Sequence, residues 1–454
     1  MSKNKMRTII TMFFFALLLL IVDIFGPAFS PVFLRAADWP QWRGPYFTGS
    51  SDEVNLPASW GKSKNIVWVA PLPGPSAATV AVCKGKVFVS STVKGQKKLV
   101  ALCFDAETGK KLWQRTVVEK KIRFPRNNPA SPSPVADSKK VIFFFGSGDL
   151  ACFDRTGKRL WYRDLEKDYG NMAIKFGYSS SPLLYANKLY ILFARSIKAY
   201  RRPGSDKPLD SFLLAINADT GKTIWKQLRT TNAVRESKDA YTTPIPFVRA
   251  GGTAEILCAG ADFITSSDAQ TGKELWRFEY RREKVTMARL VPTLVVGDGL
   301  IFGCLGRHKG VFAIKPAVIT QGRAENVPDK FTWLFTGPSP DCSTPLFYKG
   351  RLYIMYDMAS GGIVSCLEPK TGRQIWQKKL KGSGPWWASL TAADDKIYCV
   401  SEKGNVIVFA AADEYRELFR TVIEEKPIQS SIVIAQGSLF IRTASNLYCI
   451  RKCK

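Results

Sequence analysis

The chain has 454 residues, of which 46% are hydrophobic, 12% aromatic and 23% charged, a composition that can fill a large core and excludes a long disordered tract. Its single histidine, His308 in the loop GRHKG, is expected to be a solvated polar residue, which removes most of the case for histidine metal clusters and Ser-His-Asp catalysis. The net charge of +28 predicts attraction of anions, and because no nucleic-acid motif is present, acidic polysaccharide, anionic lipid or an acidic protein is favoured as the partner.

Residues 1–37 have the layout of a signal peptide. A basic start precedes an apolar run from Ile9 to Val22, which is shorter than the ~20 residues of a membrane span. Two weak cleavage sequences follow, so the cleavage position stays open. We expect a periplasmic or secreted protein without a transmembrane segment after cleavage, in which residues 38–454 form one domain. An uncleaved anchor is the alternative.

One short pattern recurs along the chain. Asp105–Trp113 reads DAETGKKLW, and the related copies DRTGKRLW, NADTGKTIW, DAQTGKELW and EPKTGRQIW follow. Each copy comes after a short apolar run, so it predicts a strand, a tight turn with glycine at positive φ, and a second strand. Self-similarity every 40 to 65 residues in an all-β pattern indicates repeated sheets around an axis.

Three weaker copies complete a series of eight aromatic anchors. FTWLF lacks the turn, EYRELF has phenylalanine in place of tryptophan, and IVWV (Ile66–Val69) precedes the first full repeat. The anchors are Trp68, Trp113, Trp161, Trp225, Trp276, Trp333, Trp376 and Phe419. Ser430–Ile450 has three strands and no aromatic strand, so IVWV is expected to close the last sheet. The predicted fold is all-β: an eight-bladed β-propeller of four-stranded antiparallel blades, closed by an N-terminal strand.

The ten cysteines divide into two groups. Cys103, Cys152, Cys366 and Cys449 occupy one blade position at which other copies carry alanine, so they are expected to be small buried thiols, too far apart to bridge. No pairing is assigned to the others, which are Cys83, Cys258, Cys304, Cys342, Cys399 and Cys453.

Loops that follow the anchors are the candidate partner surface, because rigid sheets hold such loops at fixed positions. They are Lys120–Asn128, Arg229–Tyr241 and Gly382–Trp387. The candidate contact residues in these loops and in the basic loop YRREK are Arg123, Arg126, Arg281, Arg282, Trp386 and Trp387. The two tryptophans could stack on a sugar or on an aromatic ring of a partner, but packing inside the propeller is the preferred interpretation. For the basic loops, a solvated surface that only keeps the protein soluble is preferred over a partner contact.

The repeat resembles that of pyrroloquinoline quinone (PQQ) propellers, found in quinoprotein alcohol dehydrogenases and in the BamB component of outer-membrane assembly. DWPQWRGP and LPASW near the start, and SSSPLLYANKLYIL further on, resemble secreted bacterial PQQ-binding-like β-propeller repeat proteins. The resemblance covers residues 38–451. It implies that a repeat tryptophan docks each blade onto the next and does not stack on a quinone, and an indole that buries about 150 to 250 Å² suits that role. The docking residues are then Trp68, Trp113, Trp161, Trp225, Trp276, Trp333 and Trp376.

Enzymes of this family hold PQQ against a disulfide of adjacent cysteines, with calcium bound by carboxylate and amide ligands and an aspartate as base. This chain has no adjacent cysteines, no CxxCH haem motif and no match to the calcium ligands, so no catalytic, cofactor or metal residue is assigned. The sequence favours a monomeric, non-catalytic propeller that binds a protein or an anionic polymer in the cell envelope. A PQQ- and calcium-dependent oxidoreductase acting on alcohols or sugars, and a BamB-like outer-membrane assembly component, remain as alternatives.

Overall fold

The computed structural model describes residues 37–61, 64–120, 124, 126–196, 210–249, 254–281, 283–321, 323–358 and 361–452. The signal peptide expected at residues 1–37 lies outside these ranges except for its last residue, and so do Arg123, Arg282 and Cys453. Within the described ranges, no helix has the length and apolar character that crossing a membrane requires.

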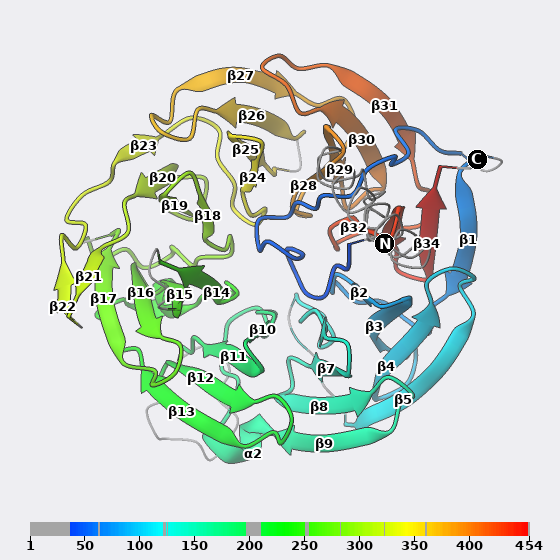
Figure 1. Ribbon diagram of the computed structural model, residues 1–454, viewed down its shortest axis with the longest axis horizontal. Helices are drawn as coiled ribbons and strands as arrows, with labels where there is room; N and C mark the ends of the chain where they lie inside the picture. Colours follow the sequence, from blue (N-terminus) through cyan, green and yellow to red (C-terminus); the bar gives the residue numbers. More distant parts are fainter. Residues whose placement is uncertain are drawn as a thin grey trace, which may run out of the picture. The chain divides into compact units, whose positions relative to one another are not determined.

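Eight four-stranded antiparallel sheets surround a central axis as the blades of a β-propeller (Figure 1). From the axis outward, blade 1 consists of β2 Ala81–Cys83, β3 Lys86–Thr92, β4 Lys98–Asp105 and β5 Lys111–Glu119, and blade 2 consists of β6 Val135–Ala136, β7 Lys140–Phe144, β8 Asp149–Asp154 and β9 Arg159–Asp164. Blade 3 consists of β10 Leu183–Tyr185, β11 Lys188–Phe193, β12 Phe212–Asn217 and β13 Thr223–Leu228, and blade 4 consists of β14 Ile245–Val248, β15 Ala254–Gly260, β16 Phe263–Asp268 and β17 Glu274–Glu279.

Blades 5 to 8 follow the same plan. Blade 5 consists of β18 Val295–Gly297, β19 Leu300–Cys304, β20 Val311–Ile314 and β23 Trp333–Phe335, and blade 6 consists of β24 Leu346–Tyr348, β25 Arg351–Tyr356, β26 Ile363–Leu367 and β27 Gln374–Lys379. Blade 7 consists of β28 Thr391–Ala393, β29 Lys396–Val400, β30 Asn405–Ala410 and β31 Glu417–Val422, and blade 8 consists of β32 Val433–Ala435, β33 Ser438–Arg442, β34 Asn446–Arg451 and β1 Ile66–Pro71. The remaining elements of the described residues are the hairpin of β21 Val318–Thr320 and β22 Arg323–Glu325, the helix α2 Leu165–Tyr169 and the 3-10 helix η1 Arg235–Lys238. The predicted fold class is confirmed.

Blade 8 takes its outer strand from the other end of the chain. β1 pairs with β34 in antiparallel register, with Trp68 opposite Cys449. The buried guanidinium of Arg442 in β33 also reaches blade 1, where it donates to the carbonyl of Ser90 at 2.6 Å. The N-terminal strand therefore closes the ring, as predicted from the missing aromatic strand of the last repeat.

A small residue stands directly opposite the anchor in most blades. Cys103 pairs with Trp113 and Cys152 pairs with Trp161, whereas Ala215 takes the same position in blade 3. An indole on the neighbouring strand leaves room only for a small side chain, which is the reason for the exchange of cysteine and alanine. The four cysteines predicted at this position are buried and free, which confirms that prediction, and every other described cysteine is also free.

Five tryptophan anchors donate their indole N–H to a carbonyl in the turn of the next blade. In blade 1, Trp113 donates to Arg155 at 3.2 Å, and a Cβ atom on the turn residue Gly157 would lie 2.8 Å from the Trp113 ring. The five pairs are Trp68 with Ala106, Trp113 with Arg155, Trp161 with Ala218, Trp333 with Pro369, and Trp376 with Ala412. The indole and the turn glycine are thus parts of one contact between blades.

Two anchors differ from this pattern. Trp276 donates to the carboxylate of Glu255 in its own blade at 3.2 Å. Trp225 packs beside Gly272 of blade 4, and its buried N–H has no acceptor among the described residues. Both rings still pack against the neighbouring blade, so the contact survives where the hydrogen bond does not.

The segment Ala37–Gly61, which we call the N-terminal arm, runs inside the ring before β1 (Figure 1). Backbone bonds join it to the inner part of four blades: Trp39 with Val82, Pro40 with Ala136, Gly49 and Ser51 with Ala392, and Ala37 with Gln436. The buried guanidinium of Arg43 donates to the carbonyls of Pro345 at 2.7 Å and Leu390 at 2.8 Å. Most of these partners lie close to the turns between first and second strands, so the arm covers that end of the axis.

Candidate functional site

A closed circle of serine and threonine hydroxyls surrounds the axis, one from each blade. Each hydroxyl oxygen accepts the backbone N–H of the equivalent residue in the preceding blade at 2.9 to 3.3 Å. We call these residues the hydroxyl belt: Thr79, Ser133, Ser181, Thr243, Thr293, Thr344, Ser389 and Ser431. The belt satisfies a buried backbone donor in every blade and ties each blade to the next.

A second circle lies two residues before the belt. Alternate residues of an extended chain point the same way, so these side chains face the axis on the same side as the belt. We call them the variable ring: Ala77, Ser131, Ser179, Tyr241, Val291, Cys342, Trp387 and Gln429. The belt has one chemistry throughout, whereas the variable ring combines small, aromatic, aliphatic, thiol and amide side chains. A nearly symmetric scaffold thereby acquires an asymmetric wall.

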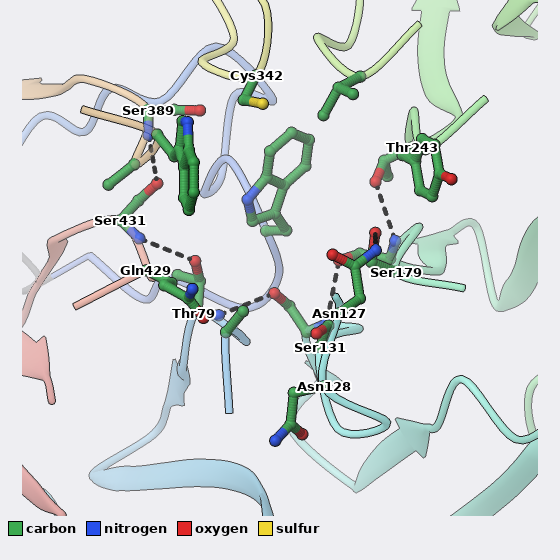
Figure 2. A pocket seen from close by; sticks show the side chains of 18 of the residues that line it. Thr79, Asn127, Asn128, Ser131, Ser179, Thr243, Cys342, Ser389, Gln429 and Ser431 are labelled. Carbon is green, nitrogen blue, oxygen red and sulfur yellow. Dashed lines mark hydrogen bonds between the residues drawn. The ribbon is translucent and has the colours of Figure 1, made fainter. Parts of the chain in front are cut away.

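Both circles line a cavity of about 210 Å³ on the axis. Figure 2 shows belt and ring residues meeting there, among them Thr79, Thr243, Ser389, Ser431, Ser131, Ser179, Cys342 and Gln429. The lining is completed by Trp42 of the N-terminal arm and by Arg126, Asn127, Asn128, Phe176, Arg289 and Ala388. Among the described residues of this lining, none is Asp or Glu. The wall therefore presents positive charge, aromatic rings, amides and hydroxyls.

Arg126 and Trp387 meet at the cavity although they come from different loops. Arg126 lies between β5 and β6, Trp387 lies between β27 and β28, and the guanidinium carbon is 4.8 Å from the centre of the indole ring. Arg126 is exposed, and no described residue forms an ion pair or hydrogen bond with its guanidinium. Its charge is therefore available to a ligand, and the contact with the indole face holds it in place.

The second arginine of the cavity is already paired. Arg289 binds both carboxylate oxygens of Asp341, at 2.8 and 3.3 Å, and its guanidinium carbon lies 5.4 Å from the ring centre of Phe176. The pair is largely buried, so Asp341 cancels much of the charge of Arg289. Arg126 is left as the open cation of the lining.

A buried carboxylate shapes the wall at Cys342. Asp357 accepts the backbone N–H groups of Asp341 at 3.2 Å, Cys342 at 2.6 Å and Ser343 at 2.8 Å. Burial raises the pKa of the Cys342 thiol well above its ordinary value, so this thiol is protonated at neutral pH. Cys342 is then a weakly polar part of the wall and not a thiolate nucleophile.

Asp239 is buried behind the cavity, two residues before Tyr241 of the variable ring. Burial is the main reason that its pKa rises to about 7. One carboxylate oxygen accepts the backbone N–H of Lys175 at 3.2 Å, and the other has no partner among the described residues. This carboxyl therefore changes its charge near neutral pH.

The structure brings together only part of the predicted contact set. Arg126 and Trp387 lie in the cavity. Trp386 is fully buried in the core between blades 6 and 7, so it packs inside the propeller, the preferred interpretation, and is not a partner contact. Arg281 lines a different depression and pairs with Asp262 at 2.7 Å. His308 is not in the cavity lining, and its Nδ1 lies 2.7 Å from the carbonyl oxygen of Ser339.

The belt and Trp42 were not foreseen. The belt has a signal in the sequence, because its Ser or Thr residues recur at intervals of 54, 48, 62, 50, 51, 45 and 42 residues, in step with the blades. In the described part of the chain, no group of three or more His, Cys, Asp or Glu side chains is arranged to hold a metal ion.

These features define a class of protein: an eight-bladed propeller with a polar cavity on its axis and an arm across one end. A family model described as outer membrane protein assembly factor BamB matches residues 47–200, 210–318 and 343–452. The chain therefore belongs to this family of BamB-like, PQQ-repeat β-propellers. No curated protein sequence matches the chain.

Solved structures share the fold at low identity. Quinohemoprotein alcohol dehydrogenase from Comamonas testosteroni is 13% identical with a TM-score of 0.61, over 92% of this chain and 81% of that one. A europium-containing methanol dehydrogenase is 11% identical with a TM-score of 0.63, over 91% and 89%. BamB from Moraxella catarrhalis is 14% identical with a TM-score of 0.56, over 86% and 97%. Such identities establish the fold alone.

Proposed function

We propose that the protein is a non-catalytic binding propeller of the cell envelope that recognises an anionic partner, a protein or a polymer, at the axial cavity. The observation that carries this proposal is the lining, which combines an unpaired arginine with aromatic rings, amides and hydroxyls and has no carboxylate among its described residues. Such a wall attracts negative charge and offers fixed hydrogen-bond donors. The belt supports the proposal further, because it holds the wall rigid before any ligand arrives.

Membership in the BamB-like family supports a place in the cell envelope. The basic and apolar layout of residues 1–37 supports export to the periplasm or beyond. A role in outer-membrane assembly is a narrower form of the same proposal. It requires that the full-length protein co-purifies with a β-barrel assembly protein without a cross-linker. If it does not, the role in outer-membrane assembly is rejected and only the broader proposal stands.

The experiment that tests the proposal is capture from envelope extracts with the full-length protein as bait. Bound protein and bound acidic polysaccharide are both measured for the wild type and for the Arg126→Ala, Trp387→Ala double variant. Arg416→Ala is the matched control, because Arg416 is an exposed arginine in the β30–β31 turn, at the opposite end of its blade from the cavity loops. We expect capture to fall with the double variant only. Equal capture by all three proteins would remove the cavity from the proposal.

The second candidate is a quinoprotein oxidoreductase, which the shared fold with dehydrogenases favours. Arg126 suits one carboxylate of PQQ, and Trp42 and Trp387 suit its flat ring system. Calcium prefers carboxylate and carbonyl oxygens, and the described lining presents two guanidinium groups and no carboxylate. These residues do not fit the metal of that mechanism. Titration with PQQ and calcium, followed by absorbance and dye reduction, is expected to give no turnover.

A further inference from the structure

We propose that the axial cavity binds a uronic acid residue at the end of an acidic polysaccharide chain. This inference rests on the proposed function and names the chemical class of its ligand: one pyranose ring, one carboxylate and several hydroxyls. Four features of the cavity carry it, namely its charge, its aromatic walls, its hydrogen-bonding groups and its size.

The charge of the cavity suits a single carboxylate. Arg126 has no charged or hydrogen-bonded partner among the described residues, whereas Arg289 is already bound to Asp341. One free guanidinium fork binds one carboxylate with two parallel hydrogen bonds. A phosphate, or any group that places a second negative charge inside the cavity, would bring more charge than this lining can balance.

Two indoles offer faces for a sugar ring. Trp42 and Trp387 both line the cavity, and no described residue accepts a hydrogen bond from either indole N–H. Arg43 lies behind Trp42, with its guanidinium carbon 5.9 Å from the ring centre, and is itself bonded to the carbonyls of Pro345 and Leu390. The C–H groups of a pyranose carry partial positive charge and pack on the negative face of an indole. The arm thus supplies a fixed platform for a sugar.

The remaining polar groups suit hydroxyls that both donate and accept. Each belt hydroxyl accepts a backbone N–H and keeps its own proton to donate. The side-chain N–H₂ groups of Asn127 and Gln429 are held by Gly177 at 2.7 Å and Glu402 at 2.7 Å, which leaves their carbonyl oxygens as acceptors. The backbone carbonyls of an acidic peptide would need N–H donors from the wall. The backbone N–H groups of the belt residues are already bonded to belt hydroxyls. The cavity therefore favours a sugar over a peptide.

The size of the cavity agrees with one ring. Its volume of about 210 Å³ is below the range of roughly 300 to 1,000 Å³ that is typical of sites for drug-sized ligands. The connections between outer and inner strands surround the cavity at the end of the axis away from most of the arm contacts, so the rest of a polymer chain has a route out. A terminal residue of a longer chain fits these conditions.

The test is calorimetric titration of the full-length protein with four probes: galacturonate, a short oligogalacturonate, a neutral gluco-oligosaccharide of the same length and a glutamate hexapeptide. We expect the oligogalacturonate to bind at least tenfold more tightly than the neutral sugar and the peptide, and the monomer to bind with intermediate strength. Arg126→Ala should reduce oligogalacturonate affinity by about tenfold or more, which is the worth of a charge-assisted hydrogen bond. Arg126→Lys should recover only part of it, and Arg416→Ala should change nothing.

The outcomes separate this inference from the proposed function. Binding of the glutamate peptide in preference to both uronates, with dependence on Arg126, would overturn the sugar and keep an anionic protein partner. Equal binding of neutral and acidic sugars would overturn the role of Arg126. If no probe binds and envelope capture is unchanged by the Arg126 and Trp387 substitutions, both this inference and the proposed function are overturned. Melting temperatures of the variants show that each is folded.

Discussion

The glycine of the repeated Thr-Gly turn meets two requirements at once. It adopts positive φ, +87° at Gly157, and it lies so close to the anchor of the preceding blade that a Cβ atom would approach the Trp113 ring to 2.8 Å. Turn geometry alone would also admit asparagine. The close approach to the indole of the preceding blade admits only glycine. This explains why every full repeat has glycine in its turn.

We expect Gly157→Ala to lower the free energy of unfolding by more than Gly85→Ala. Both glycines have positive φ, +87° and +76°, but a Cβ atom on Gly85 would meet nothing within 4 Å. Strain alone costs Gly85→Ala about 1 kcal/mol. Gly157→Ala adds the displacement of Trp113 and should cost about 2 to 4 kcal/mol. Urea denaturation measures both, and equal losses would show that the glycine serves the turn alone.

The buried carboxyl of Asp239 gives a prediction about pH. Its pKa in the folded protein is about 7, against an ordinary value of 3.8, so the folded state keeps a proton that the unfolded state releases. Stability is therefore lost as the pH rises from about 4 to 7 and stays low above that range. Asp239→Asn removes the charge and keeps an acceptor for Lys175. The variant should gain up to ~4 kcal/mol over the wild type at pH 8, and little at pH 4.

Chemical denaturation across this pH range checks the prediction for Asp239. Asp154→Asn is the control, because the bonds of its turn lower the pKa of Asp154 against the effect of its burial. Asp154 is ionised in both the folded and the unfolded protein between pH 5 and 8. The effect of Asp154→Asn on stability should therefore not depend on pH in this range. A stability difference for Asp239→Asn that is the same at pH 5 and pH 8 would contradict the assignment.

The adjacent pair Trp386 and Trp387 shows what the sequence reveals about single residues. Both were predicted at a partner surface, but Trp386 lies in the core and Trp387 lies in the cavity. Neighbouring residues of an extended chain point to opposite sides, so at most one of the two could face a ligand. Which one does so depends on the position of the belt residue Ser389, which the hydrophobic pattern does not mark.

At the scale of elements, the strands were predictable where turn chemistry marks them. The Asx and Thr-Gly turns gave the hairpins between third and fourth strands of blades 1 to 4 and 6. Blade 5 lacks that turn because the hairpin of β21 and β22 stands between β20 and β23. The belt escaped prediction for a different reason. Its residues recur once in each blade and four of them precede a proline, but only the ring geometry brings each hydroxyl to the next blade.

The belt predicts a stability effect that does not involve a ligand. Thr293 is buried and outside the cavity lining, and its hydroxyl accepts the backbone N–H of Thr243 at 2.9 Å. Thr293→Val keeps the shape and leaves that N–H unsatisfied, so it should cost about 1 to 3 kcal/mol. Thr116→Val, at an exposed position of β5, should change stability by less than about 0.5 kcal/mol. Equal stabilities of the two variants would show that the belt does not couple the blades.

At the scale of the whole molecule, ring closure and the cavity depend on the same end of the chain. Counting strands was enough to predict that the segment with Trp68 completes blade 8, because an open edge would otherwise remain. Nothing in the sequence indicated that the arm before it runs inside the ring and adds Trp42 to the cavity. Buried contacts such as those of Arg43 with Pro345 and Leu390 join residues 302 and 347 positions apart, which no local pattern reports.

Two truncations separate closure from cavity. A chain that starts at Asn65 keeps β1 and loses the arm, so it should stay monomeric, melt at a lower temperature and lose ligand binding with Trp42. A chain that starts at Leu72 also loses β1, which exposes the edge of β34 and the space left by Trp68. Loss of a large buried aromatic costs about 3 to 5 kcal/mol. Because a domain has only about 5 to 15 kcal/mol to lose and an open edge recruits other chains, the Leu72 form should aggregate. Light scattering and thermal melts compare the two, and a monomeric Leu72 form that melts with the Asn65 form would show that the ring holds without β1.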